Sequence, residues 1–168
     1  ETENLGEIQS KGTIEISGDT KNDGKIVSEK TIEIKGKAEN KGTLYGEESI
    51  TIEKDLKNTG NIQSTGDIKI KQNTENSGKI LTDESFNTKN LDNSGKITAN
   101  KEINTENTEN RLTGELGIGE NLNVTGNLDN KGKIKATEKI KVTAGIITSG
   151  AMFPGSEIER KDTKKRGA

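Results

Sequence analysis

The sequence predicts an all-β protein, a parallel β-solenoid of about nine turns with 18 residues in each turn. A repeating glycine, two columns in phase with it and a repeating pair of apolar residues lead to this prediction. The glycines recur at spacings of 18, 18, 18, 18, 17, 19, 18 and 18 residues. They are Gly6, Gly24, Gly42, Gly60, Gly78, Gly95, Gly114, Gly132 and Gly150. A fixed period of this length is typical of stacked repeat architectures.

An asparagine column and an apolar column keep phase with the glycines. Two residues before the glycine lie Asn4, Asn22, Asn40, Asn58, Asn76, Asn93 and Asn130. Two residues after it lie Ile8, Ile26, Leu44, Ile62, Ile80, Ile97, Leu116, Ile134 and Met152. Asparagine and glycine tolerate left-handed or strained backbone, so we expect them to form the corners. Stacked asparagine side chains can also bond from turn to turn.

The second half of each unit carries apolar residues at positions i and i+2. The pairs are Ile14/Ile16, Ile32/Ile34, Ile50/Ile52, Ile68/Ile70, Phe86/Thr88, Ile103/Thr105, Leu122/Val124 and Ile140/Val142. This period places both members on one face of a strand, whereas a helix would put them on opposite sides. The pattern therefore predicts short strands with one buried face.

Two weaker inward columns complete the unit. One precedes the asparagine: Thr20, Ala38, Leu56, Thr74, Thr108, Leu128 and Ile146. The other follows the Gly-x-Ile isoleucine and is made of small residues: Ser10, Ser28, Gly46, Ser64, Thr82, Ala99 and Ala136.

A unit of 18 residues with two or three short strands cannot enclose a core of its own, but stacked copies can. Parallel pairing at ~4.8 Å per turn would give a rod on the order of 40 Å long. The composition is polar, with 25% hydrophobic and 32% charged residues. A thin core under a large surface accounts for this composition, although an unfolded linker remains the alternative.

The composition also excludes several kinds of chemistry. The chain has no His and no Cys, which removes triads, thiolate metal sites and disulfides. Basic and acidic residues number 26 and 28 and are interspersed, which disfavours nucleic acid and anionic membranes as partners. No apolar run is long enough for membrane insertion, and no calcium-binding nonapeptide is present. We expect no enzyme, no cofactor and no metal.

The departures from the repeat are local. One residue is missing between Phe86 and Asn93, and one extra residue between Thr105 and Gly114 would put Leu112 in the asparagine column. Asn107 to Arg111, in the irregular stretch around Asn107–Leu116, is the first place to seek recognition, although repeat-array variation is the simpler explanation. We expect a solenoid over residues 1–154. Residues 155–168 should form a charged C-terminal tail, frayed or capping.

The segments NDGKIVSEKTIEIKG and NTGNIQSTGDIKIKQ, at residues 22–36 and 58–72, resemble the repeats of filamentous-haemagglutinin-type exoproteins. The similarity covers nearly all of residues 4 to 153 and implies a right-handed parallel β-helix. It also implies two-partner secretion and a bacterial cell-surface or secreted location. Such repeats form adhesin shafts or stalks for contact-dependent inhibition, although the units here are shorter and no secretion or toxin domain is recognisable.

The resemblance transfers only structural residues, in the asparagine, glycine and isoleucine ladders. They are Asn22, Asn40, Asn58, Asn76, Gly24, Gly42, Gly60, Gly78, Ile26, Ile62, Ile80, Ile32, Ile34, Ile50, Ile52, Ile68 and Ile70. The expected function is a structural or adhesive shaft segment, a piece of a longer secreted protein. Its partners would be flanking domains and a surface receptor. The alternative is a glycan-binding or glycan-cleaving β-helix of the tailspike or polysaccharide-lyase kind, which would need a groove with convergent carboxylates.

Overall fold

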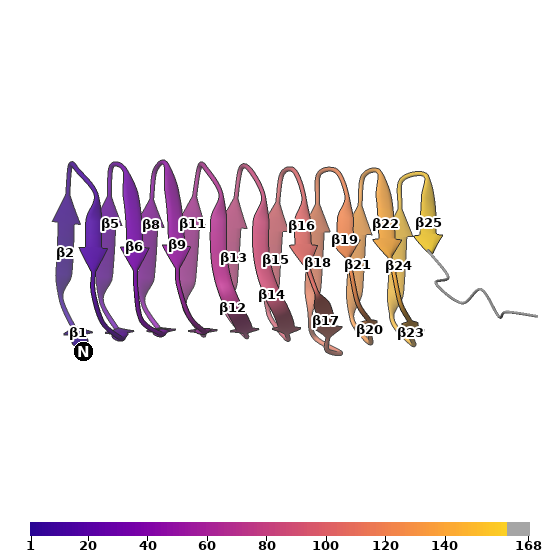
Figure 1. The fold of residues 1–168 in the computed structure, drawn as a ribbon, viewed down its shortest axis with the longest axis horizontal. Helices are drawn as coiled ribbons and strands as arrows, with labels where there is room; N and C mark the ends of the chain where they lie inside the picture. Colours follow the sequence, from indigo (N-terminus) through magenta and orange to yellow (C-terminus); the bar gives the residue numbers. More distant parts are fainter. Residues whose placement is uncertain (161–168) are drawn as a thin grey trace, which may run out of the picture.

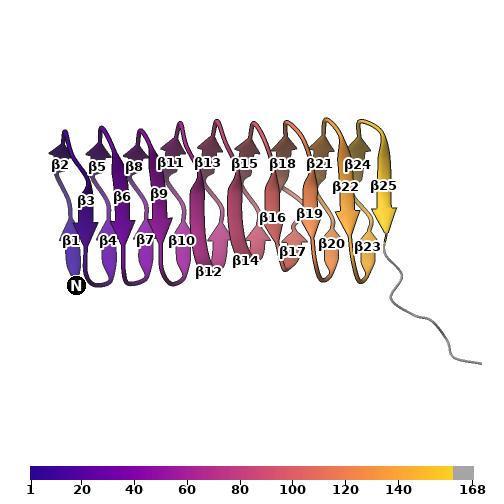
Figure 2. The ribbon, with the colours of Figure 1, turned by 45° about the horizontal axis from the view of Figure 1, so that its top comes forward.

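The computed structural model describes residues 1–160, and these residues are built of strands without helices. The chain winds through nine stacked turns into a straight rod (Figure 1). Equivalent strands of successive turns pair in parallel, so that the rod has three faces (Figure 2). The predicted β-solenoid of about nine turns is confirmed.

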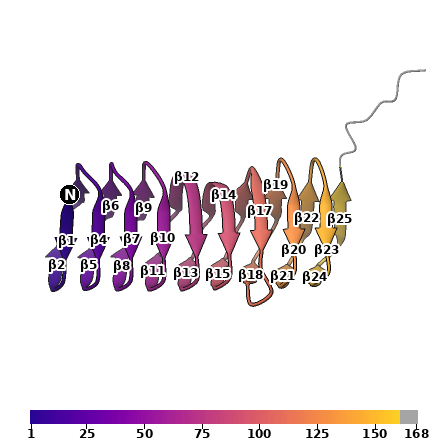
Figure 3. The same ribbon diagram turned by 90° about the horizontal axis from the view of Figure 1, so that it is seen from below.

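The first face holds the strands that end in the asparagine column. Its separate strands are β1 (Thr2–Asn4), β4 (Thr20–Asn22), β7 (Ala38–Asn40), β10 (Leu56–Asn58), β17 (Asn107–Asn110), β20 (Leu128–Asn130) and β23 (Ile146–Thr148). Figure 3 views the rod from the side on which these strands lie.

The second face holds the Gly-x-Ile strands and forms a separate sheet of nine strands. They are β2 (Glu7–Ser10), β5 (Lys25–Ser28), β8 (Thr43–Gly46), β11 (Asn61–Ser64), β13 (Lys79–Thr82), β15 (Lys96–Ala99), β18 (Glu115–Ile118), β21 (Lys133–Ala136) and β24 (Ala151–Pro154).

The third face holds the strands of the Ile-x-Ile pairs. Its separate strands are β3 (Ile14–Ile16), β6 (Thr31–Ile34), β9 (Ser49–Ile52), β16 (Ile103–Thr105), β19 (Leu122–Val124), β22 (Lys139–Val142) and β25 (Glu157–Arg160).

Two long strands join the third face of one turn to the first face of the next. They are β12 (Ile68–Asn76) and β14 (Phe86–Asn93), which exceed the three or four residues expected for each strand. Their register shifts between Ile70 and Asn73, because β12 has two residues at this corner and β14 has one. The missing residue is therefore at the corner occupied by Lys89.

The core is a stack of like side chains along the rod axis. All the isoleucines assigned to the ladders are at most 1% exposed. They are Ile26, Ile32, Ile34, Ile50, Ile52, Ile62, Ile68, Ile70 and Ile80. Burial of an aliphatic side chain contributes about 1.5–3 kcal/mol, which explains how so polar a chain folds.

The structure adds two apolar residues to the weaker inward columns. Leu91 pairs with Thr74 on the first face, and Ile118 pairs with Ala99 on the second. Both side chains are buried. The missing residue before Leu91 had hidden the first of them from the pattern.

The glycine corners have a different cause from the one expected. Within residues 1–160 no residue has a positive φ, so the expectation of left-handed backbone was wrong. A Cβ at Gly24 would instead overlap the carbonyl oxygen of Gly6 in the preceding turn, and Gly42, Gly60, Gly78 and Gly95 repeat this conflict. The glycine column is required by the close approach of successive turns.

The asparagine column differs from the prediction in the irregular turn. Asn110, and not Leu112, pairs with Asn93 and Asn130, while the Leu112 side chain is 80% exposed. Three residues separate Asn110 from Gly114, where one residue separates Asn93 from Gly95. The corner before β17 lacks a residue as well, because Asn107 pairs with Asn90 and only Glu106 lies between Thr105 and Asn107.

The solenoid also extends beyond the expected boundary at residue 154. Strand β25 pairs in parallel with β22, with Ile158 opposite Ile140. The rest of the predicted tail, residues 161–168, lies outside the described residues.

Candidate functional site

Hydrogen bonds within the asparagine column run along the rod axis. From Asn4 to Asn110, each asparagine Nδ2 donates to the Oδ1 of the asparagine in the next turn at 2.8–2.9 Å. The column contains Asn4, Asn22, Asn40, Asn58, Asn76, Asn93, Asn110 and Asn130, all buried. Nδ2 also donates to a backbone carbonyl of the next turn, as Asn22 does to Thr43 at 2.9 Å. These amides bond to the protein itself, so the column joins turns and offers little to a ligand.

The loop Arg111–Thr113 projects between β17 and β18 and breaks the line of corners (Figure 3). The Arg111 guanidinium donates two hydrogen bonds to the Asp92 carboxylate, which raises the pKa of Arg111 above its ordinary value. Thr113 Oγ1 donates to the Ser94 carbonyl at 2.7 Å. The loop is thus tied to the turn before it, with Leu112 at its exposed tip.

A row of four carboxylates crosses the first face beside this loop. Glu75, Asp92, Glu109 and Asp129 follow one another in register on β12, β14, β17 and β20. Neighbouring strands bring such side chains to about 5 Å from one another. The row is partly neutralised, since Lys57 lies 3.7 Å from Glu75 and Lys131 lies 3.4 Å from Asp129.

A parallel row of asparagines runs beside the carboxylates, each asparagine two residues before a carboxylate in the sequence. Asn90 Nδ2 donates to Asn73 Oδ1 at 2.8 Å, and Asn107 Nδ2 donates to Asn90 Oδ1 at 2.9 Å. Asn107 Oδ1 then accepts the backbone N–H of Asn127 at 3.0 Å. The two rows line a groove of about 510 Å³ over the middle turns.

This groove includes part of the stretch singled out in the sequence. Asn107 and Glu109 line it, and Arg111 lies beside it through its pairing with Asp92. Sequence reasoning missed the other carboxylates, Glu75, Asp92 and Asp129. Their common column was obscured by the missing residues at the corners of β14 and β17.

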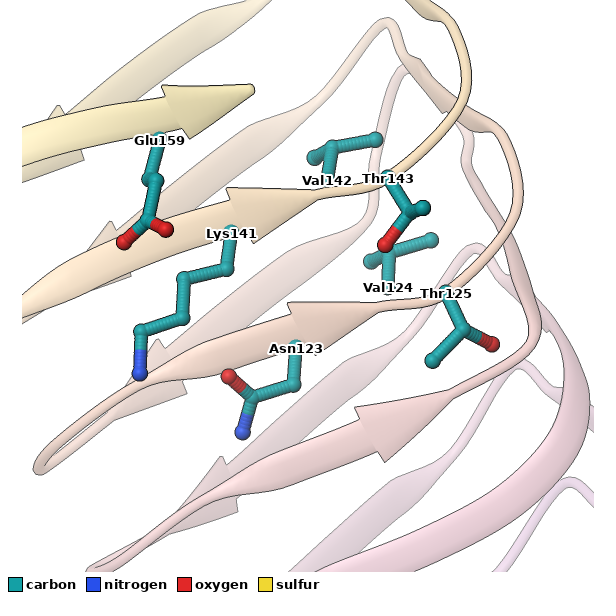
Figure 4. Close-up of a pocket in the computed structure, with 7 residues that line it drawn as sticks. All are labelled: Asn123, Val124, Thr125, Lys141, Val142, Thr143 and Glu159. Atoms are coloured by element: carbon teal, nitrogen blue, oxygen red, sulfur yellow. The ribbon is translucent and has the colours of Figure 1, made fainter. Parts of the chain in front are cut away.

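A smaller hollow of about 200 Å³ lies on the third face near its C-terminal end (Figure 4). Asn123, Lys141 and Glu159 project side by side from β19, β22 and β25, with Thr125 and Thr143 at the following corner. The hollow is smaller than the ~300–1,000 Å³ usual for small-molecule sites.

Among residues 1–160, no group of three or more acidic side chains is placed to hold a metal ion. The same residues contain no helix of the length and apolarity needed to span a membrane. The first-face groove, with its rows of carboxylate and amide side chains, is the candidate site.

Comparison with models of known protein families, with curated proteins and with solved structures finds no match for this chain.

Proposed function

We propose that this chain is a segment of the shaft of a secreted or cell-surface bacterial exoprotein of the filamentous-haemagglutinin type. Its role would be to hold a binding or toxic part at a distance from the cell. The observation that supports this proposal best is the asparagine column, which continues from Asn4 to Asn130 without a break. A side chain that eight successive turns repeat serves the stacking of turns.

The hydrogen bonding of the rod favours a mechanical role. Three backbone ladders join each turn to the next, and the buried amide column adds a fourth connection. Bending the rod would stretch one of these ladders and leave buried polar groups without partners, which costs about 1–3 kcal/mol for each group. A rod of this kind keeps the parts joined to its ends at a fixed distance and transmits force between them.

The surface also suits a spacer. Ion pairs between successive turns, such as Lys41 with Asp23 and Lys71 with Glu53, join acidic and basic side chains along the rod. Exposed pairs of this kind contribute about 0–1 kcal/mol each. They leave the surface charged, with acidic and basic side chains in balance. The partners we propose are flanking domains and a receptor on a host or neighbouring cell.

The shaft proposal predicts that the distance at which the chain holds an attached part depends on the number of turns and not on the surface side chains. The test displays the chain on a bacterial surface, anchored at its N-terminus and with a peptide epitope at its C-terminus. Deleting residues 20–55 removes two turns in register, since Asp19 and Asp55 are equivalent. Binding of a bulky antibody to the epitope should fall, while a small fragment of that antibody should bind as before.

The control is a full-length chain with the groove carboxylates removed, Glu75→Gln, Asp92→Asn and Glu109→Gln. It should retain epitope access, because these side chains lie on the surface of the rod. Equal antibody access to the long and shortened rods would contradict the proposal.

A glycan-binding or glycan-cleaving β-helix is the second candidate, and the first-face groove favours it. Carboxylate and amide side chains line this groove in two rows, and both can bond to sugar hydroxyls. A glycan array probed with the wild-type chain tests this candidate. Binding that the same triple variant abolishes, with its fold intact by circular dichroism, would favour the glycan function over the shaft.

A further inference from the structure

The first and second faces of the rod differ in charge, although the whole chain is nearly neutral. On the first face, the residue before each member of the asparagine column points outward, and these residues form one row along the axis. Carboxylates outnumber lysines in this row, which we name the acidic row. It reads Glu3, Lys21, Glu39, Lys57, Glu75, Asp92, Glu109, Asp129 and Ile147.

The second face has two outward rows. The basic row follows the glycine corner and reads Glu7, Lys25, Thr43, Asn61, Lys79, Lys96, Glu115, Lys133 and Ala151. The neutral row lies two residues further along each strand and is mostly uncharged. It reads Gln9, Val27, Tyr45, Gln63, Leu81, Thr98, Gly117, Lys135 and Phe153.

Three lysines of the basic row have no acidic partner in the chain itself. Within residues 1–160, Lys25, Lys79 and Lys133 form no ion pair, whereas Lys21 and Lys57 of the acidic row both do. A face that carries unpaired charge of one sign attracts a surface of the opposite sign. The second face is therefore suited to a partner with a row of carboxylates.

A second copy of this chain carries such a row at the same spacing, because the strands of both copies repeat at ~4.8 Å. Where two parallel rods of the same winding touch, the strands of the facing surfaces run in opposite directions. This arrangement brings the acidic row of one copy opposite the basic row of the other, and the asparagine row of the groove opposite the neutral row. In antiparallel rods the acidic row would face the neutral row instead, so charge favours the parallel arrangement.

A displacement by one turn gives the best match of charges. Each residue of the basic row then faces the residue of the acidic row that lies in the next turn, and the one pair of like charges is Glu115 with Asp129. Without the displacement like charges would meet in three turns, and with displacement in the other direction in two. The pairs of opposite charge are Glu7/Lys21, Lys25/Glu39, Lys79/Asp92 and Lys96/Glu109.

The neutral row then lies over the first-face groove without a conflict of charge. Gln63 faces Asn73, and Thr98 faces Asn107, so amide and hydroxyl groups meet the amides that line the groove. Leu81, which is 37% exposed, is covered by the same contact. The groove and the neutral row thus fit one another in polarity as the charged rows do in sign.

The contact is small. A strip ~40 Å long and ~10 Å wide buries about 400 Å² of each partner, which is less than the roughly 800 Å² per partner of a stable complex. The association is therefore weak and needs concentrated rods. Because it joins two different faces, each copy keeps one face of each kind free, and the assembly grows beyond a dimer.

We infer that the second face is an interaction surface for the first face of a second copy of this chain, parallel to it and displaced by one turn. This contact would gather neighbouring rods side by side. It goes beyond the proposed shaft function and is independent of it, since a single rod already holds an attached part at a distance.

Sedimentation of the full chain at concentrations up to about 1 mM tests the contact. The parent chain should associate at low salt and disperse at about 0.5 M salt. The second-face variant is Lys79→Glu with Lys96→Glu, and the first-face variant is Asp92→Lys with Glu109→Lys. Each variant alone should associate about tenfold more weakly than the parent chain. Mixing the two should restore association, because every contact between unlike variants joins opposite charges.

Disulfide trapping tests the direction and the displacement, and it does not depend on the charge variants folding. The chain has no Cys, so single cysteines can be placed in separate copies. In a mixture of Lys25→Cys and Glu39→Cys chains, mixed disulfides should outnumber those between like chains by about tenfold, because facing thiols have a high effective concentration. A mixture of Lys25→Cys and Ile147→Cys chains, which would face one another in antiparallel rods, should show no such excess.

The inference is overturned if the parent chain stays monomeric at low salt, or if the mixed charge variants stay as dispersed as each one alone. Equal trapping in the two cysteine mixtures also overturns it. A monomeric parent chain that binds immobilised heparin, with binding lost in the second-face variant, would assign the basic row to a polyanion instead. None of these results would contradict the shaft proposal, which the antibody-access experiment tests separately.

Discussion

At the scale of single residues, asparagine and glycine act on neighbouring turns more than on their own corner. The asparagine amide connects three turns, since Asn58 accepts from Asn40 and donates to Asn76. The glycine allows two turns to approach, because a side chain at Gly60 would overlap the backbone of Lys41 and Gly42. Both residues are needed for the stacking of the chain on itself.

Asn58→Ala should lower the free energy of unfolding by about 2–3 kcal/mol, since it leaves the buried Oδ1 of Asn76 without its donor and removes one of the acceptors of Asn40 Nδ2. Urea denaturation followed by circular dichroism measures the change. Asn104→Ala is the matched control, because Asn104 bonds to Asn87 and Asn123 in a similar row that is only half-buried. We expect a change within about 0.5 kcal/mol for it, and equal effects of the two substitutions would show that burial of the column is unimportant.

Gly60→Ala should destabilise the chain by about 3 kcal/mol or more, because the backbone of two turns must separate to accommodate the methyl group. Gly117→Ala on β18 is the control, since its nearest neighbour would be Thr98 Oγ1 at 3.6 Å, an ordinary contact. The comparison is made by thermal unfolding at one protein concentration. A stable Gly60→Ala variant would contradict the close approach of turns at this corner.

At the scale of strands, the sequence pattern predicted two or three short strands in each turn, and the structure has three. The pattern failed where the turn length changes. Period-two pairs such as Ile50/Ile52 located the third face directly, because a buried column repeats one residue type. The assignment of Leu112 to the asparagine column was wrong. It assumed the usual spacing of two residues before Gly114, whereas the extra residues lie in a projecting loop and Asn110 takes that position. Glu75 and Asp92 were missed for a related reason, because a column of outward residues has no apolar signal to fix its register across a missing residue.

Ile68→Asp tests the register of the third face. Its side chain is fully buried between Ile50 and Phe86, so a carboxylate there should cost about 4 kcal/mol or more. Hydrogen exchange should show loss of protection first in β9, β12 and β14. Lys69→Asp, on the adjacent outward position, should leave protection intact, and similar losses for both variants would contradict the assignment of inward and outward positions.

The last strand is expected to respond to pH. A hydrogen bond from Lys139 holds the pKa of Glu157 below its ordinary value of 4.5. The pair therefore stabilises β25 above about pH 4.5, and this stabilisation is lost as the pH falls through the lowered pKa. Amide exchange in β25, corrected for the intrinsic pH dependence, should show less protection at pH 3 than at pH 6. The Glu157→Gln chain should show a smaller pH response, and an unchanged response would assign it to other carboxylates.

At the scale of the whole molecule, residues 1–160 form a rod of stacked turns. The turns differ most at the Arg111–Thr113 loop, and less at the corners before Asn90 and Asn107, where one residue is missing. Apolar residues are few but lie in columns that the stack buries, while the charged residues pair across turns on the surface. The proposed shaft function depends on this uniformity, since the spacing between two attached parts then follows from the number of turns.

The distance between spin labels along the first face tests this central claim most directly. The chain has no Cys, so cysteines introduced at Glu3, Glu75 and Asp129 can be labelled in pairs. Glu75 and Asp129 lie four and seven register steps from Glu3. Pulsed electron paramagnetic resonance should give narrow distributions near ~19 Å and ~34 Å, at ~4.8 Å per turn. Broad distributions, or distances that do not increase in proportion to the number of turns, would contradict the stacked parallel rod.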